Sequence, residues 1–148
     1  MTFKELIEKF EFYIDQFPSL FSSKQYGAYA EFTRDQEILY PAVFIERPSA
    51  EKIDISNNTT QMTCALVFSD RSLEDMSNRI QILSKLRNSA LILLKSMQQR
   101  EDVDMTNVSF LLSEEEGNDR VYYIRAEFDI TLQFPQVCLD AETYDHDC

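Results

Sequence analysis

Glycine, histidine and tryptophan are scarce in this sequence, and their scarcity argues against several kinds of active site. The 148 residues include two glycines, one histidine and no tryptophan. A phosphate-binding loop needs several glycines close together, whereas Gly27 and Gly117 lie far apart in the chain. The single histidine, His146, cannot build a multi-histidine metal site. We therefore expect no catalytic residues, no bound metal and no cofactor, and we expect that the protein is not an enzyme.

Basic residues, long apolar runs and paired cysteines are lacking as well. The chain has 14 Lys and Arg against 26 Asp and Glu, a net charge of −12, which repels nucleic acid and predicts no specific binding to it. No stretch approaches 18 apolar residues, so no membrane span or membrane partner is expected. The three cysteines, Cys64, Cys138 and Cys148, are odd in number and widely spaced, which indicates a reducing compartment such as the cytoplasm.

Apolar and aromatic residues are plentiful. They make up 44% of the chain and include 11 Phe and 7 Tyr, enough for one hydrophobic core. The length predicts one domain. We expect a single α+β domain over residues 1–135, followed by an acidic, flexible C-terminal tail over residues 136–148.

Apolar residues at helical spacing predict two helices. The first covers residues 3–17. The second covers residues 72–99 and opens with a capping-box pattern at Ser72 and Asp75. Its second half is apolar nearly all round, so we expect it to be covered on more than one side. Its main apolar stripe consists of Leu73, Met76, Ile80, Leu83, Ala90, Leu94 and Met97, widened by Ile82, Leu86 and Leu93.

Alternating residues predict three strands in the first half of the chain. Residues 25–33 and 38–46 alternate and are expected to form a hairpin, and residues 59–68 form a third strand, with Cys64 in the core. Pro41 cannot donate a ladder hydrogen bond, which predicts an edge position for its strand. Residues 47–58 are polar and are expected to form a loop.

The clearest pattern is a long C-terminal hairpin. Residues 108–113 alternate, a tip follows at residues 114–119, and residues 122–134 alternate again with apolar residues at every second position. The positions between them form one polar face: Arg125, Glu127, Asp129, Thr131 and Gln133. Together these patterns predict one antiparallel β-sheet of four to five strands with two α-helices packed on one face.

The polar face of the last strand is the main candidate site. Glu127 and Asp129 are about 7 Å apart on one strand face, a distance that could suit a carboxylate pair, although a solvated or interfacial face is the favoured interpretation. We predict that the face meets a second subunit or lines a lumen, the subunit contact being favoured, and that Arg125 pairs with a carboxylate across it. Further candidates for partner contact lie at the hairpin tip and in the tail: Glu114, Glu115, Glu116, Asp140 and Glu142.

The order of elements, the length and the acidic charge resemble the tail terminator, or tail-completion, proteins of long-tailed bacteriophages. The resemblance is carried by the helix at residues 3–17, the strand at 59–68, the helix at 72–97 and the hairpin at 108–134. It is a resemblance of layout without a short diagnostic motif. It implies a homo-oligomeric ring, typically a hexamer, that caps the tail tube at the head-tail junction and has no enzymatic activity. It also implies tail-tube and head-completion proteins as partners, DNA passing through the lumen, and a virion protein assembled in the bacterial cytoplasm.

Two alternatives stay open. One is a small cytoplasmic adaptor or regulatory module that binds a protein partner through a sheet edge, such as the strand around Pro41. The other is an enzyme whose site has no recognisable motif. Ring assembly would favour the phage interpretation, whereas a stable monomer with a concave pocket would favour the alternatives.

Overall fold

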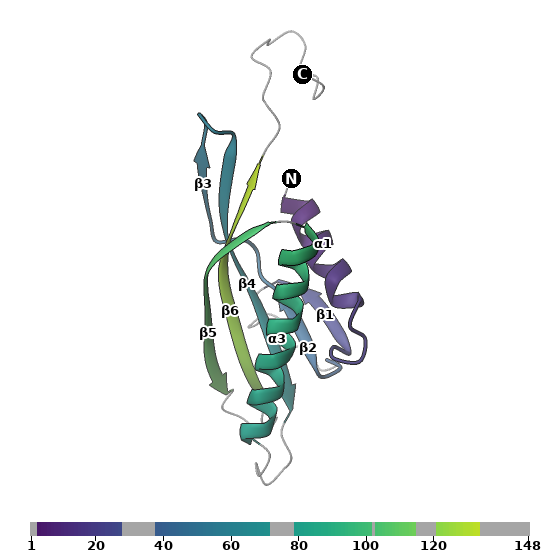
Figure 1. Ribbon diagram of the computed structural model, residues 1–148. Coiled ribbons are helices and arrows are strands. Elements are labelled where there is room, and N and C mark those ends of the chain that lie inside the picture. Colours follow the sequence, from purple (N-terminus) through teal and green to yellow (C-terminus); the bar gives the residue numbers. More distant parts are fainter. Residues whose placement is uncertain (1–2, 28–37, 72–78, 102, 115–120, 134–148) are drawn as a thin grey trace.

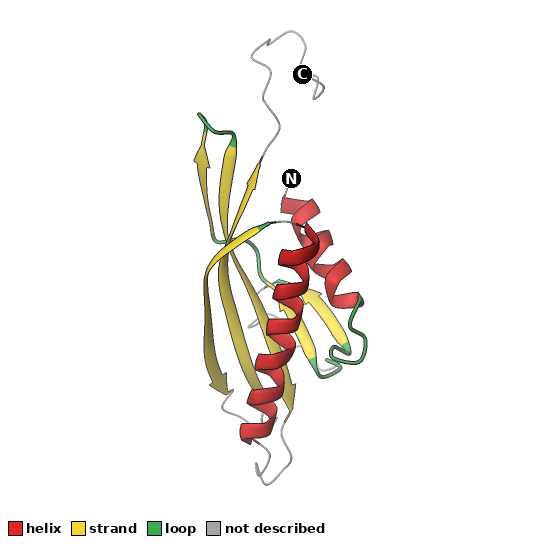
Figure 2. Ribbon diagram, viewed as in Figure 1, coloured by secondary structure: helices red, strands yellow, loops and turns green. Residues whose placement is uncertain are grey.

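The part of the chain that the structure describes contains two helices and six strands. It is a computed structural model, and the described residues are 3–27, 38–71, 79–101, 103–114 and 121–133. The elements in chain order are α1 (Phe3–Asp15), β1 (Ser23–Tyr26), β2 (Ala42–Ile45), β3 (Ala50–Asp54), β4 (Thr59–Arg71), α3 (Arg79–Glu101), β5 (Asp104–Glu114) and β6 (Val121–Gln133). Both helices lie on one side of a single sheet (Figures 1 and 2), which confirms the α+β class.

The sheet is mixed and has six strands, not the four to five antiparallel strands that were expected. Its order is β1-β2-β4-β6-β5, and β3 pairs with the first half of β4. Every described pair is antiparallel except β1 with β2, which run parallel with Ser23 opposite Ala42 and Tyr26 opposite Ile45. The prediction of an antiparallel hairpin is therefore wrong at Gln25 and Tyr26, which pair in parallel with Phe44 and Ile45. The rest of the predicted first strand and its turn, residues 28–37, lie outside the described part of the chain.

Pro41 does not mark an edge strand. It stands just before β2, which lies between β1 and β4. Its carbonyl oxygen accepts a hydrogen bond at 2.7 Å from the N–H of Ser22, the residue before β1. The prediction of an edge near Pro41 is wrong because β2 has a strand on each side.

The segment expected as a polar loop contains strand β3. Ala50 lies opposite Thr63 and Asp54 opposite Thr59 on β4, so the two strands form a hairpin. The Asp54 carboxylate accepts hydrogen bonds in the turn from the backbone N–H and the side-chain amide of Asn57, at 3.2 and 2.8 Å. All five β3 residues are exposed, so the strand has no half-buried alternation by which its sequence could reveal it.

The two longest strands, β4 and β6, form the centre of the sheet. Cys64 lies opposite Phe128 in this pair. The predicted alternation of β6 is confirmed, and Cys64 is buried in the core as expected. Asp129 lies close enough to add to the effect of burial, and together they raise the pKa of the Cys64 thiol to about 12. The buried β6 side chains are Tyr122, Ile124, Ala126, Phe128, Ile130 and Leu132.

Helix α3 buries one stripe of its side chains against the sheet. Its buried residues are Ile82, Leu86, Ser89, Ala90, Leu93, Leu94 and Met97. Leu83 is partly buried against this core, whereas Ile80, assigned to the stripe from sequence, is 72% exposed. Leu91 and Ile92 are 39% and 45% exposed, so in the single chain the apolar second half is not covered all round. The predicted helix start, with Ser72, Asp75, Leu73 and Met76, lies outside the described residues.

Helix α1 packs beside α3 and is fastened to its last turn. Phe10 meets the Phe128 ring edge to face at 6.1 Å, which anchors α1 over the sheet. The Glu101 carboxylate accepts hydrogen bonds from the Tyr13 hydroxyl and from the Lys9 ammonium, both at 2.6 Å. These two donors hold the pKa of Glu101 below its usual range. Burial, with the bond to Glu101, raises the pKa of Tyr13 to about 12.

Candidate functional site

The polar face predicted for the last strand exists and points away from the helices. We call Arg125, Glu127, Asp129, Thr131 and Gln133 of β6 the sheet polar face. Both helices cover the opposite face of the sheet (Figure 1). The register of β6 on β4 places the five residues beside the side chains of Val67, Ala65, Thr63, Gln61 and Thr59. The structure therefore brings together all five residues that the sequence singled out on this strand.

Arg125 lies between two carboxylates of its own chain. Its guanidinium donates to one Glu46 oxygen through Nη2 at 2.8 Å and Nε at 3.1 Å, and to Glu127 through Nη1 at 2.7 Å. These bonds, the one to Glu46 foremost, raise the pKa of Arg125 above its usual range. The side chains of Glu46, Arg125 and Glu127 are 21%, 30% and 47% exposed. Two carboxylates around one guanidinium leave this trio with one negative charge.

Sequence reasoning missed Glu46. It lies 79 residues before Arg125 in the chain. It follows β2, and its backbone N–H bonds to the Ala65 carbonyl at 3.1 Å, which aligns it with β4 beside β6. No local pattern indicates this pairing, because it depends on β4 separating β2 from β6.

Asp129 is held by neutral donors. Its carboxylate accepts hydrogen bonds from the Thr63 hydroxyl at 2.7 Å, the Asn107 amide at 2.9 Å and the Gln61 amide at 3.3 Å. The bonds from Asn107 and Thr63 hold the pKa of Asp129 below its usual range. Asn107 has a φ of 54° and lies where the pairing of β5 with β6 shifts register, between Thr106 and Ser109. Asp129 thus fastens an irregular stretch of β5 to the sheet.

Glu127 and Asp129, considered as a carboxylate pair from the sequence, have separate partners. Glu127 bonds to Arg125, and Asp129 to its three neutral donors. Within the described ranges, no three side chains of His, Cys, Asp or Glu gather as metal ligands would. What the arrangement offers chemically is a set of fixed, half-exposed acceptors with negative charge, suited to a cationic partner.

The other predicted contact residues are not brought to this face by the described structure. Glu114 is the last residue of β5, opposite Tyr122 on β6. Glu115 and Glu116 lie outside the described residues, as do Asp140 and Glu142 in the tail.

A second surface stands out on the helical side. We call Lys85, Arg87, Leu91, Ile92 and Lys95 the α3 outer face, since all five are exposed and lie on the side of α3 away from the buried stripe. Arg87, Leu91 and Lys95 follow one another at spacings of four, so they form one row along the helix. Lys85 and Ile92, seven apart, lie beside that row.

Exposed apolar residues also gather on β5, an edge strand of the described sheet. Val108, Leu111 and Leu112 are 46%, 63% and 56% exposed. Leu111 lies opposite Arg125 in register and so belongs to the same side of the sheet as the sheet polar face. Contacts with another molecule would cover these side chains.

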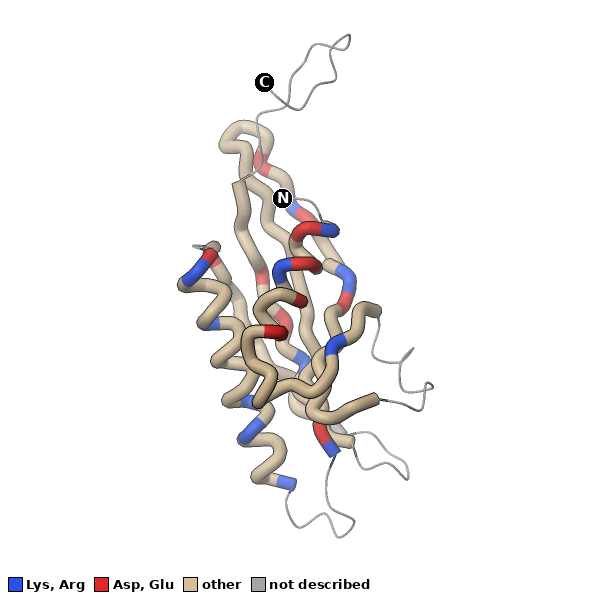
Figure 3. Tube along the Cα trace, turned by 90° about the vertical axis from the view of Figure 1, so that its right-hand side faces the viewer, with Lys and Arg blue, Asp and Glu red and all other residues tan. Residues whose placement is uncertain are grey.

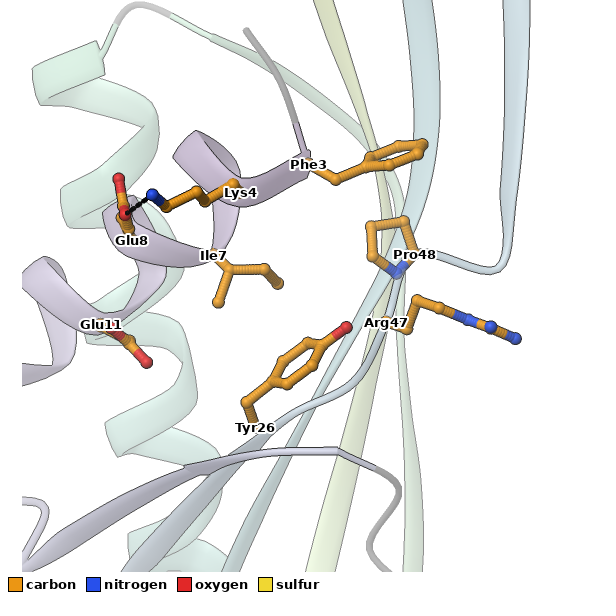
Figure 4. A pocket seen from close by; sticks show the side chains of 8 residues that line it. All are labelled: Phe3, Lys4, Ile7, Glu8, Glu11, Tyr26, Arg47 and Pro48. Carbon is orange, nitrogen blue, oxygen red and sulfur yellow. Dashed lines mark ion pairs between the residues drawn. The ribbon is translucent and has the colours of Figure 1, made fainter.

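A shallow groove of about 530 Å³ lies between α1 and the segment after β2. Phe3 and Ile7 of α1, Tyr26 of β1 and Pro48 form its apolar part (Figure 4). Charged side chains surround it, and Glu8 is paired with Lys4 at 3.7 Å while the Arg47 side chain extends away. The groove offers apolar surface with few converging polar groups.

Comparison with known proteins adds no relative. The sequence matches no protein-family model, and no curated protein matches it significantly. Neither helix in the described part of the chain is both long and apolar enough to cross a membrane. A function for this chain must therefore be argued from its surfaces.

Proposed function

We propose that the protein is a structural subunit that assembles with copies of itself into a ring. The observation that carries the proposal is apolar surface exposed on two regular elements: Leu91 and Ile92 on α3, and Val108, Leu111 and Leu112 on the edge strand β5. Side chains of this kind on rigid elements are typical of protein–protein contacts. The sheet polar face adds fixed hydrogen-bonding groups on the side of the sheet that the helices leave open.

The finer proposal is that the ring completes or terminates the tail tube of a long-tailed phage at the head-tail junction. It is supported by the layout that suggested it, because α1, β4, α3 and the β5–β6 hairpin follow in the order of the elements that carry the resemblance. On this proposal the partners are the same chain, the tail tube and the head-completion proteins. DNA would pass through the lumen without being bound, since like charge disfavours adhesion. The protein would be located in the virion after assembly in the host cytoplasm.

A second candidate is an adaptor that binds a protein partner through a sheet edge. The edge of β5 that no described strand covers favours it, in place of the Pro41 edge that the structure rules out. An extended segment could add to β5 by backbone hydrogen bonds while its side chains contact Leu111 and Leu112.

The experiment that separates the two is a measurement of assembly by the purified full-length chain. Light scattering over a range of micromolar concentrations, followed by negative-stain imaging, should give closed rings of constant copy number. A chain that stays monomeric at every concentration would contradict the ring. If such a monomer bound a protein from the same cells through β5, the adaptor function would replace the ring function.

A further inference from the structure

We infer that the α3 outer face of one copy docks onto the sheet polar face of the next copy, with cations of the helix meeting carboxylates of the sheet. The inference rests on the proposed ring and names its two contacting surfaces. The two surfaces lie on opposite sides of the subunit (Figure 1). The α3 outer face is exposed and the sheet polar face is partly exposed, although a second buried cluster around Phe44 and Val67 lies beside Arg125 on that side of the sheet.

The helical surface has an excess of positive charge in a chain that is strongly negative. Helix α3 carries five Lys or Arg residues and one carboxylate, Glu101, which is bound to Lys9 and Tyr13 of α1. Figure 3 shows basic positions along the length of α3, whereas acidic and basic positions alternate on α1. Lys85, Arg87 and Lys95 make no ion pair with any carboxylate that the structure describes. They are thus available for carboxylates from outside the chain.

The sheet surface has the opposite charge and is closed to further anions. Arg125 already binds Glu46 and Glu127, so a third carboxylate arriving from a neighbour would meet two like charges. Glu46, Glu127 and Asp129 outnumber Arg125 and Lys52, the cation whose charge acts on Asp129. A neighbour's cation would therefore be attracted where a neighbour's carboxylate would be repelled. This reverses the sign of the partner that the sequence predicted for Arg125.

Apolar groups also match between the two surfaces. Leu91 and Ile92 lie among the cations of α3, and Leu111 lies beside Arg125 on the sheet. Exposed apolar side chains among cations favour a protein partner over nucleic acid, whose phosphates would leave these side chains in water. The 23 residues of α3 span roughly 34 Å and the 13 residues of β6 roughly 44 Å, so the strand is long enough for the helix to lie along it.

A contact of this kind is compatible with a ring. Two different surfaces of one chain form a head-to-tail interface, which repeats from copy to copy and gives a ring where the rotation between neighbours closes and a filament where it does not. Each α3 would then lie between its own sheet and the sheet of its neighbour. The apolar second half of α3, only partly covered in the single chain, would gain the second cover that its sequence predicts.

The test uses two charge-reversed versions of the full chain. One carries Arg87→Glu and Lys95→Glu on α3, and the other carries Glu127→Lys on β6. Each should raise the concentration needed for half-assembly about 100-fold, because like charges then face each other. Mixing the two variants should restore assembly. The reversed, negative α3 of one variant can meet the reversed sheet of the other, and the unchanged α3 of the second can meet the unchanged sheet of the first.

Two controls test whether a loss of assembly comes from the proposed contact. Glu127→Gln should weaken assembly less than Glu127→Lys without placing a cation beside Arg125, and circular dichroism reports whether each variant folds. Glu8→Lys makes the same charge change on the exposed side of α1 and should leave assembly unaltered. Light scattering provides the assembly readout throughout.

The possible failures are distinguishable. A parent chain that never assembles overturns the ring and this contact with it. A parent that assembles while the α3 variant assembles equally well overturns the contact and leaves the ring standing. The contact is also overturned if Glu8→Lys disrupts assembly and Glu127→Lys does not. It is likewise overturned if the α3 variant assembles normally but loses binding to a DNA duplex, because the α3 cations then serve another partner.

Discussion

Asp129 shows how much local order one half-exposed side chain can impose. Its carboxylate holds Thr63 of β4 and Asn107 of β5, on either side of its own strand. Asn107 lies at a positive φ, which asparagine tolerates better than most residues because its short polar side chain can bond locally. The side chain and the backbone of Asn107 thus contribute separately to the shifted register of β5.

Substitution of Asn107 separates these two contributions. Asn107→Gly removes the bond to Asp129 but accepts the positive φ, whereas Asn107→Ala loses the bond and also forces a Cβ into the left-handed region. We expect the alanine variant to be less stable than the glycine variant by about 1 kcal/mol, measured as the free energy of unfolding in urea. Equal stability of the two variants would show that the backbone at this position does not need the left-handed region.

At the scale of the element, α3 has two apolar faces with different roles. Leu94 is 5% exposed and belongs to the core against the sheet, as Ala90 and Phe128 do. Leu91, three residues before it, is 39% exposed on the α3 outer face. Leu83, Ala90 and Leu94 of the predicted apolar stripe thus share one core with Phe128 of β6, with Leu83 at its margin.

The two leucines form a matched pair for mutation. Leu94→Ala should lower the free energy of unfolding by ~2–5 kcal/mol, because it opens a cavity between α3 and the sheet. Leu91→Ala should lower it by no more than about 0.5 kcal/mol in dilute protein, since the side chain is partly in water. Urea unfolding of both variants at one concentration measures the difference. If Leu94→Ala unfolds together with the parent, the placement of the helix on the sheet is wrong.

At the scale of the whole molecule, the helical layer is held together by a carboxylate. Glu101 joins the last turn of α3 to Lys9 and Tyr13 of α1, and its pKa lies below the ordinary 4.5. The folded chain therefore binds this proton less readily than the unfolded chain. The resulting stabilisation is complete above about pH 4.5 and is lost as the pH falls through the lowered pKa. Asp129 adds a contribution of the same sign, which is complete above about pH 3.8 and is lost as the pH falls through its lowered pKa.

Glu101→Gln should therefore have an effect that depends on pH. The variant should be less stable than the parent at neutral pH, and the gap should narrow at an acid pH, as the pH falls below the ordinary 4.5 and through the lowered pKa of Glu101. Urea midpoints at the two pH values measure it. Glu8→Gln serves as control, because the exposed pair of Glu8 with Lys4 contributes little at either pH. A gap that stays constant with pH would mean that the ionised carboxylate is not what stabilises the contact.

The sequence by itself determined the helices and strands whose apolar spacing follows from the period of the element itself. Side chains of a strand alternate between two faces, so the run from Tyr122 to Leu132 defined one buried and one polar face before any partner was known. The period of a helix likewise placed Leu6, Phe10 and Leu94 in the core. The same reasoning assembled the five residues of the sheet polar face.

Only the tertiary structure decided the features that depend on which segments of the chain come into contact. The parallel pairing of β1 with β2, and the strand β3 whose residues are all exposed, follow from neighbours that no local period encodes. The burial of Ile82 rather than Ile80 depends on where the sheet contacts a helix whose apolar residues permit two overlapping stripes. Glu46 reaches Arg125 only because β4 lies between their strands, a long-range arrangement that also makes the open face of the sheet negative.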